Sequence, residues 1–192
     1  MAVKKRHWIW VLVPLLLVAT VLAVAAPTVK KAAEKVLYPA TYRETVEAEA
    51  TQHGVSPSLV MAVIHTESHF DPEAVSSAGA RGLMQVTPLT LEWTQMRSEA
   101  LRELTKEDLF EAEKNIRVGV YVLALLGESF SDTETVLAAY NAGIGTVSEW
   151  LEDDAYSADG ETLHTIPYPE TAEYVKKVTA AQKKYQAIYN FT

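Results

Sequence analysis

The run from Trp8 to Ala26 holds no charged residue, and this is the feature that most limits how the chain can fold. As a helix with a rise of about 1.5 Å per residue, it would come close to spanning the ~30 Å hydrocarbon core of a bilayer. The run also lacks a polar face, which disfavours a helix that packs one side against a soluble core. We therefore expect residues 1–26 to be a membrane anchor or signal segment, with Trp8 to Ala26 crossing the bilayer.

Lys4, Lys5 and Arg6 precede this run, so the positive-inside tendency predicts a cytoplasmic N-terminus and places everything after Ala26 outside. Two interpretations remain open. A single-pass anchor is favoured because the apolar run exceeds the roughly 7–15 residues of a signal-peptide core. A cleaved signal peptide is the alternative, since Ala23-Val24-Ala25 has the small-x-small form of a cleavage site. The expected location is the cell membrane with the remainder outside, or secretion after cleavage.

Length and charge limit what the exported part can be. The chain has 192 residues, of which 48% are hydrophobic, which suits one globular domain and an appendage. Its net charge of −8 argues against nucleic acid as a partner, because nucleic-acid binding needs a basic surface. Cysteine is absent, which excludes disulfides, thiolate metal sites and cysteine nucleophiles.

Helical signals dominate after the membrane segment. Residues 27–39 are interpreted as a stalk, and residues 40–192 as one domain. Gly54 is a natural helix stop, Ser56-Pro57 a helix start, and Ser131-Asp132-Thr133-Glu134 a capping box. The predicted helices cover residues 42–53, 57–68, 88–96, 110–127 (capped by Asp108 or a neighbour), 131–143, 145–151 and 169–189. No alternating strand pattern longer than about four residues is present, so the predicted fold class is mainly α.

Glu67 is the first candidate for chemistry. It falls in the last turn of the predicted helix 57–68, whose other residues are mostly apolar. Poor hydration there would raise the pKa of its carboxyl and keep it protonated near neutrality, as a general acid requires. Its position is equally compatible with the solvated end of a helix, and spacing alone does not decide between the two.

His65 and His69 are four residues apart, a spacing that can hold zinc on one face of a helix. The metalloprotease motif, however, has glutamate directly after its first histidine, whereas Thr66 stands here. We therefore interpret both histidines as surface or groove residues and expect no metal and no cofactor.

Several motifs carry a resemblance to a known family. The first group comprises Ile64-His65-Thr66-Glu67-Ser68-His69-Phe70, Ala74-Val75-Ser76, Gly79-Ala80-Arg81-Gly82-Leu83-Met84-Gln85, Pro88 and Thr90. The second comprises Asn115-Ile116, Gly119, Tyr121, Ala138-Ala139-Tyr140-Asn141-Ala142-Gly143, Ile166-Pro167, Glu170-Thr171 and Tyr174-Val175. In this order, over about Tyr38 to Tyr189, they resemble the soluble lytic transglycosylase (SLT) family of the lysozyme-like superfamily. The resemblance implies a lysozyme-like (goose-type/SLT) catalytic domain.

The resemblance also implies a role for individual residues. Glu67 would be the catalytic acid/base, with Ser68 placing the following loop. The substrate-binding residues would be Ser68, Ser76, Gly82, Leu83, Met84, Gln85, Tyr140, Asn141 and Tyr174. Residues 82–85 would form one wall of a cleft, residues 140–141 its floor and opposite side, and Tyr174 would hydrogen-bond near the carboxyl. Each has a structural alternative: Leu83 and Met84 as core, Ser76 as a turn residue, and the tyrosines as packed rings.

The implied reaction is cleavage of the β-1,4 bond between N-acetylmuramic acid and N-acetylglucosamine in peptidoglycan, with formation of a 1,6-anhydro ring. The partners would then be glycan strands and the cytoplasmic membrane. A hydrolytic muramidase is one alternative, and it would need a second carboxylate near Glu67. Asp71 and Glu73 are near in sequence, but the resemblance gives neither a role. A wall-binding module without turnover is the non-enzymatic alternative.

Overall fold

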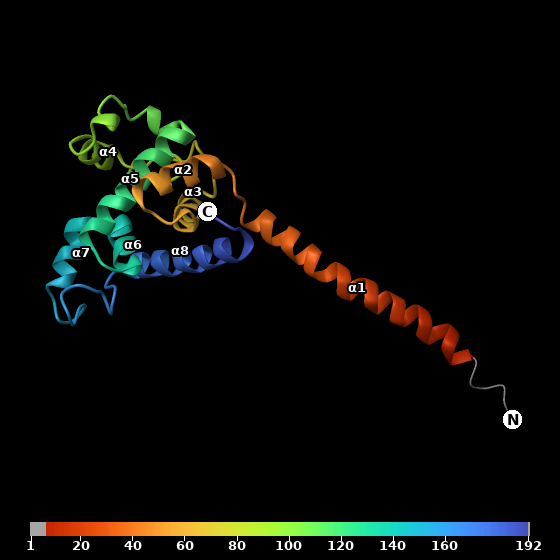
Figure 1. Ribbon diagram of the computed structural model, residues 1–192. Coiled ribbons are helices and arrows are strands. Elements are labelled where there is room, and N and C mark those ends of the chain that lie inside the picture. Colours follow the sequence, from red (N-terminus) through yellow and green to blue (C-terminus); the bar gives the residue numbers. More distant parts are fainter. Residues whose placement is uncertain (1–6, 192) are drawn as a thin grey trace. The chain divides into compact units, whose positions relative to one another are not determined.

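The computed structural model describes residues 7–191 (Figure 1). It divides between Pro39 and Ala40 into two compact units, which are described separately. Among the described residues, one helix is long and apolar enough to cross a membrane, at Leu12–Leu37, a test that a signal sequence also passes. The predicted N-terminal helix is therefore present, whereas the basic flank Lys4, Lys5 and Arg6 lies outside the described residues.

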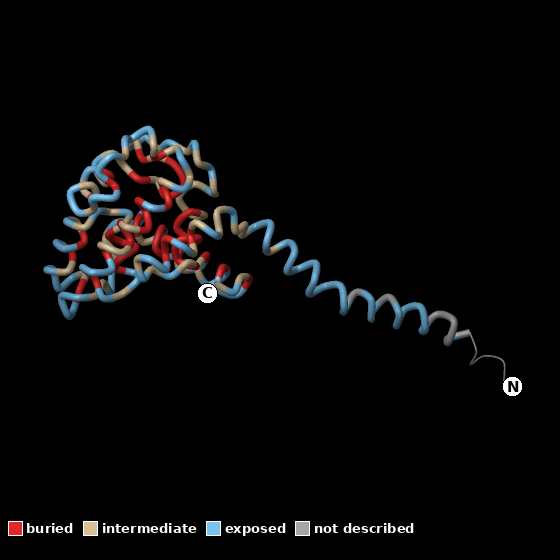
Figure 2. Tube along the Cα trace, turned by 45° about the horizontal axis from the view of Figure 1, so that its top comes forward, coloured by how far each residue is buried: buried red, intermediate tan, exposed pale blue. Residues whose placement is uncertain are grey.

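Unit one is a single helix, α1 (His7–Leu37), which continues through Pro27. The segment expected to be a separate stalk is therefore mostly helical and continuous with the apolar run. Its described side chains are almost all exposed, as the pale blue trace of Figure 2 shows, and they include Leu16 and Val24. Exposed apolar side chains along a whole helix are stable in lipid rather than in water.

Unit two is built of seven α-helices within the described residues: α2 (Arg43–His53), α3 (Pro57–Ser68), α4 (Pro88–Gln95), α5 (Ala112–Ser129), α6 (Thr133–Ala142), α7 (Ile144–Leu151) and α8 (Pro169–Ile188). Two short 3₁₀ turns, Glu99–Leu101 and Asp108–Phe110, lie between α4 and α5. Residues 7–191 contain no strand, only isolated bridges that join Arg81 to Val75 and to Val86. The mainly α prediction is confirmed.

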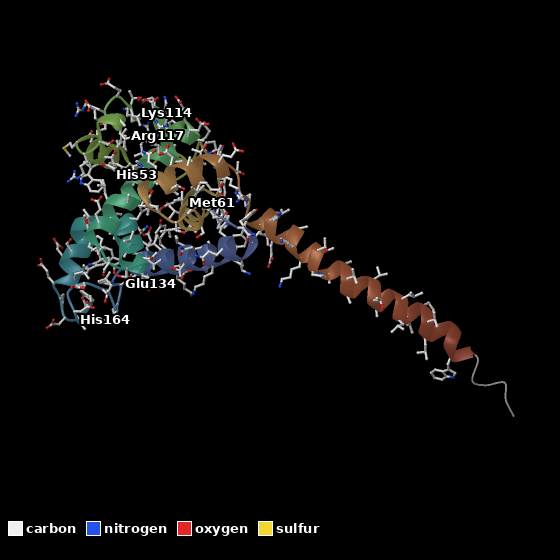
Figure 3. All side chains as sticks on the ribbon, in the orientation of Figure 1. His53, Met61, Lys114, Arg117, Glu134 and His164 are labelled. Atoms are coloured by element: carbon white, nitrogen blue, oxygen red, sulfur yellow. The ribbon has the colours of Figure 1, made fainter. Side chains whose placement is uncertain are left out.

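Helix α3 forms the centre of this unit because it is apolar on all sides. Residues 60–64 are fully buried, and α3 packs chiefly on α8 and also on α2 (Figure 1). Met61, labelled in Figure 3, is among the largest of these buried side chains. Replacing a buried residue of this size by alanine typically lowers the free energy of unfolding by about 2–5 kcal/mol, and we expect a loss in this range for Met61→Ala. The α3–α8 packing fixes the end of α3, where Glu67 lies.

Most helix ends follow the sequence signals. Gly54 ends α2 in the left-handed conformation and donates its N–H to the carbonyls of Ala50 and Thr51. α6 begins as predicted, but Asp132 rather than Ser131 is the cap, and its carboxylate accepts from the N–H groups of Glu134 and Thr135.

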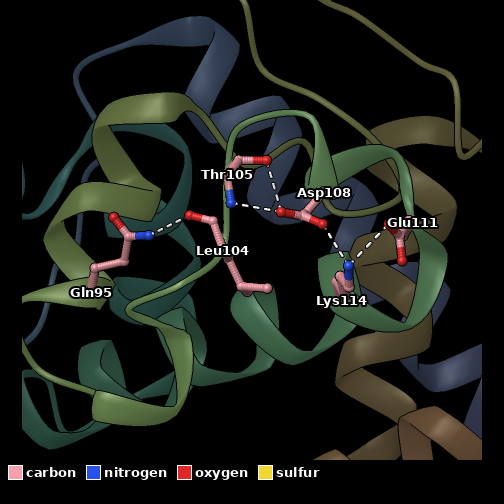
Figure 4. A network of polar contacts seen from close by, with 6 residues as sticks. All are labelled: Gln95, Leu104, Thr105, Asp108, Glu111 and Lys114. Carbon is pink, nitrogen blue, oxygen red and sulfur yellow. Dashed lines mark hydrogen bonds and ion pairs between the residues drawn. The ribbon is translucent and has the colours of Figure 1, made fainter.

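The start of α5 differs from the prediction. It lies at Ala112, with no side-chain cap, because the Asp108 carboxylate is engaged elsewhere. Asp108 accepts from the backbone and hydroxyl of Thr105 and pairs with Lys114, which also binds Glu111 (Figure 4). These contacts hold the pKa of Asp108 well below its usual range. Asp108 therefore closes the loop before α5 instead of capping the helix.

Candidate active site

A groove of about 690 Å³ opens on one side of unit two and contains Glu67. Its walls come from the end of α3, the α3–α4 turn, and helices α4, α5, α6, α7 and α8. The lining residues are Glu67, Ser76, Ser77, Ala78, Ala80, Gln85, Val86, Thr87, Leu89, Thr90, Glu92, Trp93, Met96, Val122, Leu126, Ala139, Tyr140, Asn141, Gly143, Ile144 and Glu170. A volume between roughly 300 and 1,000 Å³ is usual for ligand pockets.

Glu67 lies in the last turn of α3, half-buried at the wall of this groove. Desolvation by burial raises the pKa of its carboxyl from 4.5 to about 7, and the neighbouring Tyr174 hydroxyl opposes part of this rise. The rise agrees with the prediction made from the apolar sequence of the helix. A carboxyl with a pKa near 7 can both give and take a proton near neutral pH, as acid/base catalysis requires.

Two tyrosines lie near the carboxyl: Tyr174 is buried, whereas Tyr140 is half-buried and lines the groove. Tyr140 donates a 2.8 Å hydrogen bond to the backbone oxygen of Met84. The Tyr174 hydroxyl is close enough to lower the pKa of Glu67, yet in this structure it makes no hydrogen bond of ordinary geometry. Burial and the nearby Glu67 charge raise the pKa of both tyrosines well above 10, so both are neutral phenols.

Asn115 on α5 organises the turn that carries the groove wall. Its buried side chain accepts from the N–H of Met84 at 2.8 Å and donates to the carbonyls of Arg81 and Leu109 at 2.9 and 2.8 Å. These three hydrogen bonds use most of the donors and acceptors of one asparagine side chain. In the sequence, Asn115 belongs to one of the family motifs but has no expected role; its signal is that of an isolated asparagine on an otherwise apolar helix face.

Ser68 fastens the end of α3 to the same turn. Its hydroxyl lies 2.8 Å from the carbonyl oxygen of Leu83 and 3.2 Å from that of Ile64. Ser68 does not line the groove. Its position fits the expected role of placing the loop after Glu67 rather than direct contact with a ligand.

Ser76 and Gln85 both line the groove. The Ser76 hydroxyl accepts from the N–H of Ala80, so this residue also has the turn role considered as its alternative. Gln85 has a positive φ of 48°, and its side-chain amide donates to the carbonyls of Ala74 and Gly82.

Residues 82–84 were expected in the cleft wall, but all three are buried and none of them lines the groove. Leu83 and Met84 are fully buried, which is the core alternative. The reason is that α5 receives this turn: Asn115 binds the Met84 backbone, and Gly119 leaves space for the Met84 side chain. Leu83 and Met84 therefore pack in the core next to the groove wall and do not face the groove.

Asn141 lines the groove and is exposed, and its side-chain oxygen accepts a 2.8 Å hydrogen bond from the Thr171 hydroxyl. This contact joins the end of α6 to the start of α8. Tyr140 and Asn141, expected at the floor and opposite side of the cleft, both line this groove.

The carboxylates of the groove differ from those considered in the sequence. Asp71 and Glu73 are exposed, and neither lines the groove. Glu92 from α4 and Glu170 from α8 do line it. Glu92 and Glu170 could not be found by their sequence distance from Glu67, because their helices reach the groove only through tertiary packing.

His65 lies on α3 and His69 directly follows the helix in the left-handed conformation; their ring centroids are 5.1 Å apart. Across residues 7–191, no three histidine, cysteine, aspartate or glutamate side chains gather as a metal site would require.

Known proteins resemble this chain in sequence and structure. The family model described as Transglycosylase SLT domain matches residues 44–162. Membrane-bound lytic murein transglycosylase C of Histophilus somni is 33% identical over 78% of this chain and 47% of its own length. Soluble lytic murein transglycosylase of Salmonella typhimurium is 32% identical over 78% and 23% of the two lengths.

Solved structures give the same result. The 70 kDa soluble lytic transglycosylase of Escherichia coli superposes with a TM-score of 0.72 at 28% identity, covering 80% of this chain and 25% of that one. An inactive mutant of the lytic transglycosylase Slt from Pseudomonas aeruginosa gives 0.68 at 29% identity, with the same coverage. The chain thus spans at most about half the length of these relatives. It belongs to the family of transglycosylase SLT domains.

Proposed function

We propose that this protein is a lytic transglycosylase that cuts the β-1,4 bond between N-acetylmuramic acid and N-acetylglucosamine, with Glu67 as its acid/base. The observation that carries the proposal is one carboxyl with a pKa of about 7 on the wall of a groove large enough for a glycan. The names of the relatives support it, as does the inactive glutamate-to-glutamine mutant of the Pseudomonas enzyme.

The reaction begins with protonated Glu67. It donates its proton to the glycosidic oxygen as the bond from that oxygen to C1 of the muramoyl sugar breaks. The N-acetyl group of the same sugar stabilises the positive charge that develops at C1. The Glu67 carboxylate then removes the proton of the 6-hydroxyl, and that oxygen attacks C1. The 1,6-anhydro ring forms, no water is consumed, and Glu67 is protonated again.

Two features of the site suit this cycle. Acid/base participation of this kind is worth roughly 10²–10⁴-fold, and it is most efficient when the pKa is near the working pH. The phenols of Tyr140 and Tyr174 lie near the carboxyl and are neutral, so they add no charge to the site. Because the 6-hydroxyl is already tethered to the sugar, it has the advantage in effective concentration over water.

Hydrolysis is the second candidate, and Glu92 and Glu170 are the residues that favour it. Both line the groove that holds Glu67, so either is a candidate to hold a water. Two-carboxylate glycosidases place such groups about 5–9.5 Å apart across the bond. Mass analysis of digested peptidoglycan separates the two reactions: anhydro ends are lighter by one water and resist borohydride, whereas hydrolysis gives reducible ends.

Glu67→Gln tests the role of the carboxyl directly. Glutamine keeps the shape and hydrogen-bonding capacity of the side chain but has no proton to transfer, so release of muropeptides from purified peptidoglycan should fall by at least about 100-fold. Glu73→Gln is the matched control: it makes the same change at an exposed glutamate that does not line the groove, and it should keep the activity. Wild-type turnover by correctly folded Glu67→Gln protein would refute the proposal.

Membrane attachment is the remaining part of the proposal. The apolar helix Leu12–Leu37 and the membrane-bound relatives support a single-pass protein whose unit two faces the peptidoglycan outside the cytoplasmic membrane. Full-length protein with an intact N-terminus should be recovered from the membrane fraction. A soluble form that begins near Ala26 would instead indicate a cleaved signal peptide.

A further inference from the structure

One face of α4 presents large apolar side chains to the groove. Leu89, Glu92, Trp93 and Met96 are spaced as one helical face, and all four line the groove. Leu89 and Met96 are 75% and 76% exposed, the highest values for large apolar residues in unit two. Exposed apolar side chains gathered along one groove indicate a binding surface.

Trp93 is the largest member of this face, and it is held in place. The Arg97 guanidinium lies over its ring, 4.6 Å from the centroid, and also donates to the Trp93 carbonyl at 3.1 Å. The Tyr121 hydroxyl donates in turn to the Arg97 carbonyl at 3.1 Å. A ring fixed before the ligand arrives loses little conformational entropy on binding.

Both ends of α4 are fastened as well. At its start, the Thr87 side chain caps the helix by accepting from the N–H of Thr90. At its end, the Gln95 amide donates to carbonyls of the following loop, including that of Leu104 at 2.6 Å (Figure 4). The α4 face is therefore a rigid surface rather than a loosely packed helix.

We propose that this α4 face is a sugar subsite, at which a pyranose ring of the glycan strand packs on Trp93 while its hydroxyls donate to the Glu92 carboxylate. The inference deepens the proposed function and rests on it. A pyranose has a face of C–H groups and a rim of hydroxyls, so it matches an aromatic ring beside a carboxylate. The groove is continuous from Glu67 to Trp93, which makes the glycan strand the occupant that the geometry favours over a peptide stem.

Binding measurements on an inactive background test this subsite. Full-length Glu67→Gln protein in detergent is titrated calorimetrically with oligomers of N-acetylglucosamine, which carry no peptide, and separately with free stem peptides. Adding Trp93→Ala should weaken binding of the oligomers by about tenfold or more, whereas Trp93→Phe should retain most of the affinity. Val75→Ala, which truncates an exposed apolar residue outside the groove, is the control and should change nothing.

A second variant tests the same surface even if Trp93→Ala fails to fold. Leu89→Ala with Met96→Ala removes two exposed side chains of the same face and should also weaken oligomer binding, by about threefold or more. Unchanged oligomer affinity in both variants would overturn the subsite, as would a loss confined to stem peptides. Failure of the wild-type protein to cut peptidoglycan would instead count against the proposed function, so the two failures are distinguishable.

Discussion

The Tyr140 hydroxyl donates a 2.8 Å hydrogen bond to the backbone oxygen of Met84, and this bond joins α6 to the turn between α3 and α4. Met84 is fully buried, so its carbonyl depends on this donor inside the protein. Asn115 binds the N–H of the same residue from α5. The backbone of Met84 is thus held from two helices, and the groove wall in front of it is fixed relative to Glu67.

Tyr140→Phe should destabilise the protein, because it leaves the buried Met84 carbonyl without its donor. The expected loss is about 1–3 kcal/mol in the free energy of unfolding. Tyr174→Phe is the matched control at a pH well below 7, where Glu67 is protonated: it removes a buried hydroxyl that has no partner of ordinary geometry, so stability there should be unchanged or slightly higher. Urea unfolding of both variants measures the difference, and equal losses would show that the Tyr140 bond contributes little.

Much of this architecture was predictable, because helix boundaries depend on local signals. Pro57, Pro88 and Pro169 each begin a helix where expected, and the glycine stop at Gly54 is also correct. The groove carboxylates Glu92 and Glu170 were not predicted, since only tertiary packing brings α4 and α8 to the same groove as Glu67. The burial of Leu83 and Met84 was only the alternative interpretation of the sequence, because it depends on Asn115 and Gly119, which lie more than thirty residues away in sequence.

Gly82→Ala should be far more damaging than Gly79→Ala. Both residues have a positive φ, 69° and 76°, which an alanine adopts only with strain of about 1 kcal/mol. A Cβ at Gly79 would meet nothing within 4 Å, whereas one at Gly82 would overlap the Leu109 carbonyl and lie 2.5 Å from Nδ2 of Asn115. The melting temperature should therefore fall slightly in Gly79→Ala and strongly in Gly82→Ala. Similar melting temperatures would mean that the turn at Gly82 can move away from α5.

Asn115→Ala should lower both stability and activity. The substitution leaves the Met84 N–H and the carbonyls of Arg81 and Leu109 without their partner, at an expected cost of at least about 3 kcal/mol in the free energy of unfolding. Asn141→Ala removes one bond of an exposed residue and should cost less than about 1 kcal/mol. Denaturant titration of the two variants gives the comparison, and a small effect of Asn115→Ala would contradict its assigned role.

The pKa of Glu67 predicts how activity depends on pH. Only the protonated carboxyl can donate to the glycosidic oxygen, so kcat/KM should fall above pH 7, approaching tenfold per pH unit. The hydroxyl of Tyr174 lowers this pKa, and Tyr174→Phe should therefore move the alkaline limb to higher pH. Initial rates of peptidoglycan solubilisation from pH 5 to 9 provide the profile. If the alkaline limb of Tyr174→Phe lies at the same pH as that of the wild type, the limb reports the ionisation of a group other than Glu67.

The same pKa has the opposite consequence for folding. Because the pKa of Glu67 is about 7 in the folded state and 4.5 in its ordinary state, the folded protein holds this proton more tightly, and ionisation destabilises it. The cost is absent below about pH 4.5, grows between pH 4.5 and 7, and reaches at most about 3 kcal/mol above pH 7. Glu67→Gln should therefore be more stable than the wild type at pH 8 and about equally stable at pH 4. A stability difference that does not change between these two pH values would mean that the carboxyl is well solvated, and would remove the physical basis for its role as an acid.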